Sequence, residues 1–254
     1  MTYPMTTDFS DYTVCVTGAT SGIGKASAEA FLAAGATVIA TGRRKDRLAE
    51  LKAVHGDKLI PIELEVTDRN AVFAALGNLK VDILVNNAGM ALGIEPADKA
   101  SLDDWEAMVD TNIKGVLYVT KALLPGMLDN GRGHIINMGS IAGTYPYPGS
   151  NVYGGTKAFL EQFSLNLRAE LLGKPIRVSN IEPGLVQTEF SEKRFRGNSE
   201  KADALYADTA PLTAQDIAQS VFWCASLPAH MNINRIEIMP VVQASAALTV
   251  VRNN

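Results

Sequence analysis

The chain has 254 residues, of which 47% are hydrophobic, and its formal net charge is −4. A chain of this size and composition can bury a sizeable core and suits a single α/β domain. The acidic balance provides no basic surface for nucleic acid or an anionic membrane, and we expect neither partner. Residues 1–10 lack the apolar core of a signal peptide, and Cys15 and Cys224 lie in apolar runs without metal-ligand spacing. We therefore expect a cytoplasmic protein with two buried thiols and no metal site.

Short apolar runs alternate with helix-favouring segments along the whole chain. The runs predict strands at residues 12–17, 36–41, 58–64, 81–85, 133–138, 175–181 and 233–238. The segments between them predict helices at residues 25–34, 45–54, 68–79, 103–124, 152–172 and 213–226. This alternation, without repeats or linkers, predicts one domain over residues 1–254 that is built on a doubly wound parallel sheet.

Two segments do not fit the alternation. Residues 185–208 are irregular, charged and punctuated by glycine, as is typical of a segment that covers a site as a lid. Residues 239–254 form a tail that is too apolar for a free terminus. The tail packs either on its own chain or on a partner subunit, and we favour the second.

A glycine-rich turn joins the first strand to the first helix. It reads Gly18-Ala19-Thr20-Ser21-Gly22-Ile23-Gly24. Glycines let the backbone approach a pyrophosphate, and the helix that follows supplies free N–H groups and positive potential. The spacing Gly-x-x-x-Gly-x-Gly also fits a simple turn, so it indicates a dinucleotide site only together with other motifs.

The second strand ends in Thr41-Gly42-Arg43-Arg44. Enzymes that use NAD usually carry an acidic residue here, which holds the ribose hydroxyls. Two guanidinium groups instead suit a ribose 2′-phosphate, which they can grip through paired hydrogen bonds. The sequence therefore favours NADP(H) over NAD(H), although one of the two arginines could simply solvate the next helix.

Polar residues stand where several strands end, at the edge at which parallel sheets bind ligands. Asn86-Asn87-Ala88-Gly89 follows the fourth strand, Ser140 the fifth, and Glu182-Pro183-Gly184 ends the sixth. Asn112 lies in the middle of a predicted helix. Asparagine is unfavourable there, and we expect its side chain to form a specific hydrogen bond.

Tyr153 precedes Lys157 by four residues on a predicted helix, which places both side chains on one face. An ammonium beside a phenol lowers the phenol pKa, so that the tyrosine can transfer a proton near neutral pH. The isolated spacing is common by chance, and the surrounding motifs decide whether it is catalytic.

These motifs together resemble the short-chain dehydrogenase/reductase family over nearly the whole chain. They are residues 17–24, residues 86–89, Asn112, Ser140, Tyr153 with Lys157, and Pro183-Gly184. The resemblance implies an NADP(H)-dependent oxidoreductase with a Rossmann-type sheet of seven strands in the order 3-2-1-4-5-6-7, in a single domain with a small lid. It also implies a homotetramer.

The resemblance assigns roles to individual residues. Ser140 would polarise the substrate carbonyl, Tyr153 would donate the proton, and Lys157 would lower the tyrosine pKa and bind the nicotinamide ribose. Asn112 would fix a helix kink and a water of the proton relay. The cofactor would be held by Gly18, Thr20, Ser21, Gly22, Ile23, Gly24, Arg43, Arg44, Glu65, Val66, Asn86, Ala88, Gly89, Tyr153, Lys157, Pro183, Gly184, Val186 and Thr188. Glu65 departs from the family, which commonly has aspartate at this position beside the adenine.

A closer likeness covers the second half of the chain. Its motifs include residues 134–137, 151–153, 181–186, 227–230 and 232–234. These motifs are similar to those of the bacterial NADP-dependent 3-hydroxy acid dehydrogenases, which also act on serine or allo-threonine, and to sulfoacetaldehyde reductases. The likeness implies a small anionic aldehyde or hydroxy acid, such as 3-hydroxypropionate, as substrate.

A two- or three-carbon substrate has little apolar area, so its anionic group must supply most of the orientation. Arg194 in the lid is the first candidate to bind that group, ahead of Arg196. The expected substrate residues are Ser140, Tyr145, Tyr147, Tyr153, Gln187 and Arg194. Three alternative functions stay open at this point: sulfoacetaldehyde reduction to isethionate, reduction of a carrier-linked 3-ketoacyl thioester, and non-catalytic NADP sensing.

Overall fold

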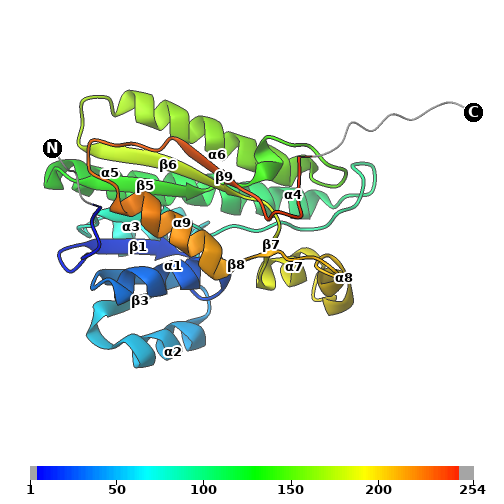
Figure 1. Ribbon diagram of the computed structural model, residues 1–254, viewed down its shortest axis with the longest axis horizontal. Coiled ribbons are helices and arrows are strands. Elements are labelled where there is room, and N and C mark those ends of the chain that lie inside the picture. Colours follow the sequence, from blue (N-terminus) through cyan, green and yellow to red (C-terminus); the bar gives the residue numbers. More distant parts are fainter. Residues whose placement is uncertain (1–4, 246–254) are drawn as a thin grey trace, which may run out of the picture.

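A seven-stranded parallel sheet forms the centre of the computed structural model, which describes residues 5–245 (Figure 1). Its strands are β1 (Thr13–Thr17), β2 (Thr37–Gly42), β3 (Leu59–Glu63), β4 (Ile83–Asn86), β5 (Gly133–Met138), β6 (Ile176–Pro183) and β9 (Arg235–Ile238). They lie in the order β3-β2-β1-β4-β5-β6-β9. Because β9 is the last of these strands along the chain, the expected order 3-2-1-4-5-6-7 and the doubly wound Rossmann-type fold are confirmed.

Helices cover both faces of this sheet. The α-helices are α1 (Gly22–Ala33), α2 (Lys45–His55), α3 (Arg69–Leu76), α4 (Leu102–Val109), α5 (Val116–Asn130), α6 (Asn151–Glu170), α7 (Glu189–Arg194), α8 (Ser199–Ala204) and α9 (Ala214–Ser226). Short 3₁₀ turns follow at η1 (Gly56–Lys58) and η3 (Ile141–Gly143), and η2 (Asp110–Gly115) is a π-helix. Helices α1, α2 and α9 pack on one face, while α3, α5 and α6 pack on the other.

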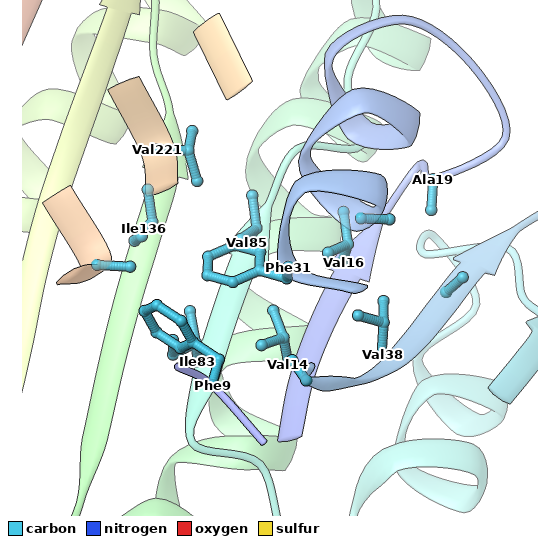
Figure 2. Packing of buried hydrophobic residues seen from close by; sticks show 14 of the residues in the cluster. Phe9, Val14, Val16, Ala19, Phe31, Val38, Ile83, Val85, Ile136 and Val221 are labelled. Atoms are coloured by element: carbon cyan, nitrogen blue, oxygen red, sulfur yellow. The ribbon is translucent and has the colours of Figure 1, made fainter. Parts of the chain in front are cut away.

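Alternate residues of each strand enter two separate cores. Val14 and Val16 of β1 join the core under α1 and α9, whereas Cys15 between them points into the core under α5. Figure 2 shows the first core, in which Phe31 of α1 lies among the strand residues. Burial on both faces explains why the strands read as nearly continuous apolar runs.

The helix predicted at residues 103–124 differs from the structure in two ways. It is interrupted by the π-helix η2, which separates α4 from α5 and contains Asn112. It also continues through Pro125 to Asn130 and is capped by Gly131, whose φ of 68° is left-handed. Proline lacks an N–H donor and normally ends a helix, and the predicted helix ended one residue before it.

The lid is more regular than its sequence suggests. It contains α7 and α8 between the two short strands β7 (Val186–Gln187) and β8 (Leu212–Thr213), which pair with each other in a second, parallel sheet. Figure 1 shows α7 and α8 beyond the carboxyl ends of the main strands. Of the predicted tail, residues 246–254 lie outside the described residues. In its first part, the side-chain oxygen of Gln243 accepts a hydrogen bond from Leu185 N at 2.7 Å.

Candidate active site

A cavity of about 650 Å³ opens at the carboxyl ends of the strands, where the sequence places its functional motifs. Its walls come from the glycine-rich turn, the ends of β2, β4 and β5, helix α6 and the lid. The predicted residues that line it are Gly18, Thr20, Ser21, Gly22, Ile23, Arg43, Arg44, Glu65, Val66, Ala88, Gly89, Ser140, Tyr153, Lys157, Pro183, Gly184, Val186 and Thr188. Segments far apart in the sequence therefore form one elongated site.

The glycine-rich turn leaves room for a group that approaches the backbone. Gly18 has a φ of 66°, and a Cβ there would lie 3.0 Å from Ala88 Cα. A Cβ on Gly24 would overlap with the Gly18 carbonyl oxygen and Asn87 Nδ2, so Gly24 lies beneath the turn and does not line the cavity. Ser21, the N-cap of α1, makes no side-chain cap hydrogen bond, which leaves the first-turn N–H groups available. These features fit the pyrophosphate that the sequence predicts.

Both predicted arginines line the cavity beside the glycine-rich turn, just after β2. Arg43 Nη1 contacts Glu65 Oε2 at 3.1 Å. Arg44 donates to Thr20 Oγ1, to Ser21 Oγ and, at 2.9 Å, to Glu189 Oε2 of the lid. Glu65 thus binds an arginine beside the expected adenine position, and the lid is tied to the end of β2 through Arg44.

Three of the four expected catalytic side chains, those of Ser140, Tyr153 and Lys157, line the middle of the cavity, and the fourth, Asn112, does not. Ser140 follows β5, while Tyr153 and Lys157 lie one turn apart on α6 and are both buried. Lys157 Nζ donates to the Met138 carbonyl at 2.7 Å and lies 5.7 Å from the centroid of the Tyr153 ring. The ring of Phe190 packs on the Tyr153 ring with centroids 5.9 Å apart. Phe190 therefore closes the cavity above the proposed acid.

Burial is the main influence on the pKa values of Tyr153 and Lys157. It raises the pKa of Tyr153 to about 12, while a hydrogen bond with Ser140 and the charge of Arg194 lower that pKa. Burial also lowers the pKa of Lys157 to about 8. The pKa reduction that the sequence predicts for Tyr153 is thus outweighed by burial in this structure, and the neighbours that oppose burial are Ser140 and Arg194.

Asn112 is fully buried in the π-helix and does not line the cavity. Its Oδ1 accepts from Met90 N at 2.8 Å, and its Nδ2 donates to Met90 O at 2.8 Å and to Thr156 Oγ1 at 3.0 Å. The predicted specific hydrogen bonding is present. The expected helix kink is a π-helical segment, and the side chain holds the loop after β4 against α6.

One of the two tandem asparagines faces away from the cavity. Asn86 is buried and donates to Thr120 and Asn137, whereas Asn87 lines the cavity and donates to Thr17 O at 2.9 Å. Neighbouring residues at a strand end point to opposite sides, so both could not face one ligand. Asn87 therefore lines the cavity and Asn86 does not, and the role of Asn86 in cofactor binding stays a prediction.

The predicted substrate residues divide into two groups. Arg194 Nη1 donates to the Tyr147 hydroxyl at 3.0 Å, and its guanidinium lies 5.9 Å from the centroid of the Tyr153 ring. Tyr145 turns away, since its hydroxyl donates to Glu237 Oε1 at 3.1 Å, and Gln187 is exposed on β7. None of Arg194, Tyr147, Tyr145 and Gln187 lines the cavity. Arg194 nevertheless lies beside the ring of Tyr153, whereas the positions of Tyr145 and Gln187 give no support to a substrate role.

Further cavity residues were not among the expected site residues, although Arg196 was the second candidate for the substrate anion. They are Gly42, Leu64, Asn87, Met90, Leu92, Thr111, Met138, Gly139, Glu189, Phe190, Lys193, Arg196 and Gly197. Arg196 also forms an ion pair with Asp104. The charged lid pattern was the available signal for Glu189, Lys193 and Arg196, while the apolar residues carry no signal that separates them from core residues.

Residues 5–245 hold no group of three or more His, Cys, Asp or Glu side chains arranged to bind a metal ion. No helix within the same range has the length and apolar character needed to cross a bilayer. Cys15 and Cys224 are free and buried.

Known proteins resemble this chain over almost its full length. The NADP-dependent 3-hydroxy acid dehydrogenase YdfG of Salmonella typhi is 54% identical over 246 residues, which cover 94% of this chain and 99% of that protein. Serine 3-dehydrogenase of Rhizobium radiobacter is 50% identical over 95% of this chain and 99% of that protein. A structure described as the closed form of serine dehydrogenase complexed with NADP+ superposes with a TM-score of 0.93 at 54% identity, and covers 95% of this chain and 100% of that one. The short chain dehydrogenase family model matches residues 12–199. The chain therefore belongs to the short-chain dehydrogenase family.

Proposed function

We propose that the protein is an NADP(H)-dependent oxidoreductase that interconverts a short, anion-bearing hydroxy compound with its aldehyde or ketone. The substrate class is a 3-hydroxy acid such as 3-hydroxypropionate, serine or allo-threonine. The observation that carries this proposal is the convergence of Ser140, Tyr153 and Lys157 on a cavity that extends to the glycine-rich turn and two arginines. The names of the relatives, which specify NADP, 3-hydroxy acids and serine, support it.

The residues present fit the cofactor. The backbone of the glycine-rich turn and the start of α1 would hold the pyrophosphate, and Arg43 and Arg44 would hold the 2′-phosphate. Ala88, Gly89 and Lys157 would flank the nicotinamide ribose. When bound, the cofactor supplies the hydride that is exchanged with the substrate carbon.

The protein groups handle the oxygen and its proton. In reduction, the hydroxyls of Ser140 and Tyr153 donate to the substrate carbonyl oxygen, and Tyr153 then delivers its proton to that oxygen. In oxidation the same groups act in reverse, with ionised Tyr153 as the base. Because burial raises the pKa of Tyr153 to about 12, oxidation should become faster as the pH rises.

Arg194 is the proposed ligand of the substrate anion. Its guanidinium is half-buried, lies within 5.9 Å of the Tyr153 ring centroid and is oriented by the Tyr147 hydroxyl. A cation beside the ring of the proposed proton donor suits a short substrate whose charged group lies near the reacting carbon.

Tyr153→Phe tests the chemistry. The variant should lose turnover by about 10³-fold or more, since its acid is removed, while the affinity for NADPH in a fluorescence titration stays unchanged. Retained turnover would refute the assignment. Loss of NADPH affinity together with turnover would instead indicate damage to the cavity.

The substrate class is tested by NADPH oxidation with succinic semialdehyde, malonic semialdehyde, sulfoacetaldehyde and an acetoacetyl thioester. We expect the carboxylate aldehydes to have the highest kcat/KM. Preference for the sulfonate or the thioester would support the corresponding alternative, and inactivity with all four would support a sensor. Arg194→Met should raise KM for the anionic aldehydes about tenfold or more. Lys201→Met, which removes a lid cation outside the cavity wall, serves as the matched control.

We also propose that the enzyme is a cytoplasmic homotetramer, as the family resemblance implies. The exposure of Val241 and Val242 at the start of the tail supports a subunit contact there. Light scattering on the eluting protein should then give about four times the 27.1 kDa chain mass. A measured mass of 27.1 kDa, which is that of a single chain, would refute the homotetramer.

A further inference from the structure

Lys193 occupies an unusual position in the cavity wall. It lies on the lid helix α7, one turn after Glu189, so both side chains project from the same helical face. Both line the cavity together with Arg43 and Arg44 from the end of β2. Glu189 is in turn bound by Arg44 at 2.9 Å and by Arg47 of α2 at 2.6 Å. The lid therefore adds one acidic and one basic side chain to a basic cluster.

Within the described residues, Lys193 is the cavity-lining cation whose side chain has no hydrogen bond or ion pair. The other four are satisfied: Arg43 by Glu65, Arg44 by Glu189, Lys157 by the Met138 carbonyl and Arg196 by Asp104. Partial desolvation is the main cause that lowers the pKa of Lys193, and the positive charges of Arg44, Arg43 and Arg47 lower this pKa further. The negative charge of Glu189 raises it without cancelling these effects. An ammonium placed among arginines without a carboxylate of its own is electrostatically unfavourable, and an anion in the cavity would remove that cost.

We propose that Lys193 binds the ribose 2′-phosphate of the cofactor from the lid side, opposite Arg43 and Arg44, and that this contact makes lid closure specific for NADP(H). The inference rests on the proposed use of NADP(H). A phosphate monoester carries close to two negative charges near neutral pH and has three acceptor oxygens, enough for the two arginines and one ammonium. Glu189 acts as the positioning group, because it holds Arg44 and Arg47 close to the helix that carries Lys193.

The arrangement links the two ends of the site through one short helix. Lys193 is followed directly by Arg194, whose guanidinium reaches Tyr147 and the Tyr153 ring. A phosphate that draws Lys193 inward therefore also fixes the residue proposed to bind the substrate anion. NAD(H), which lacks the 2′-phosphate, would leave α7 without this contact.

The test compares Lys193→Met with Lys193→Arg and with Lys201→Met, which removes a lysine from the same lid outside the cavity wall. Dissociation constants for NADPH, NADH and 2′,5′-ADP are measured by calorimetry. Lys193→Met should weaken NADPH and 2′,5′-ADP about tenfold and NADH less than about twofold, because one charge-assisted contact is lost. Lys193→Arg should retain most of the NADPH affinity, and Lys201→Met should match the wild type.

Hydrogen exchange gives a second readout that is independent of turnover. In the wild type, 2′,5′-ADP should slow exchange over residues 189–204, and in Lys193→Met this protection should largely disappear. A wild-type preference for NADPH that survives Lys193→Met unchanged would overturn the role of Lys193 alone. Equal wild-type affinity for NADPH and NADH would overturn the 2′-phosphate site itself, and with it the cofactor proposed above.

Discussion

Replacing Asn112 by alanine should destabilise the protein strongly, although this residue does not line the cavity. Its side chain is 1% exposed and makes three hydrogen bonds, at 2.8, 2.8 and 3.0 Å, to Met90 N, Met90 O and Thr156 Oγ1. A typical hydrogen bond contributes about 1 kcal/mol net, and an unsatisfied buried partner costs more. The improved helix propensity of alanine returns less than about 0.7 kcal/mol. The free energy of unfolding should therefore fall by about 3 kcal/mol.

The measurement is equilibrium unfolding in urea, read as a shift of the midpoint at unchanged slope. Asn166→Ala is the matched control, because Asn166 lies exposed on α6 and makes one surface contact with Gln162. That variant should be within about 0.5 kcal/mol of the wild type. If Asn112→Ala lost no more stability than Asn166→Ala, the anchoring role would be wrong. A collapse of kcat without a loss of stability would point instead to a direct part in proton transfer.

Three further changes test the glycine-rich turn, the buried lysine and the strand ends. Gly24→Ala should weaken NADPH binding about tenfold or more in a fluorescence titration, because the new methyl group overlaps with the backbone of the turn. Gly155→Ala is the control and should leave NADPH binding unchanged, because there is open space around its Cβ. Burial lowers the pKa of Lys157 from 10.5 to about 8, so between these values the unfolded chain binds more protons than the folded one. Wild-type stability should therefore rise relative to Lys157→Met across this pH window, by up to about 3 kcal/mol, and a constant difference would contradict the shift. Asp82→Ala should lower the unfolding free energy by about 3 kcal/mol in the same urea assay, because the Asp82 carboxylate accepts hydrogen bonds from Thr13 N at 2.8 Å and from Arg132 Nε at 2.9 Å. An unchanged midpoint would show that these contacts contribute nothing to stability.

The sheet is the part of the fold that the sequence predicts best. Strands such as β1 and β5 are buried on both faces, so their apolar runs stand out between glycines and polar residues. The order of the strands is not contained in those runs. It follows from the resemblance, because motifs at the strand ends have to meet around one ligand.

Two details of the helices cannot be predicted from the sequence, for physical reasons. A π-helix widens the backbone over a few residues and leaves the apolar periodicity on either side almost unchanged. The unfavourable Asn112 marks the position as unusual, but the apolar pattern does not identify the segment as a π-helix. Pro125 lies inside α5, although proline normally ends or kinks a helix, so the end of this helix depends on its tertiary packing.

Local motifs identify the cavity residues near each strand end, but long-range contacts decide which side chains turn inward. Arg44 meets Glu189 across 145 positions of sequence, and no local pattern indicates that pair. Tyr145 and Tyr147 are two residues apart in one loop, yet one binds Glu237 and the other binds Arg194. Such choices depend on tertiary packing, and the substrate end of the site was accordingly the least predictable.

The short pair β7 and β8 gives the lid a modular character. The chain leaves the sheet after Gln187 and returns at Leu212, where Leu212 N donates to Leu185 O at 3.0 Å. Entry and exit are thus one strand spacing apart, about 5 Å, so the intervening residues can change in length or sequence at little cost in loop closure. The lid also has its own interior contacts, since Tyr206 donates to Val186 O and contacts Ser191. Residues 188–211 therefore form a cassette, which evolution or a protein engineer can exchange to alter selectivity while the main sheet and Tyr153 on α6 stay as they are.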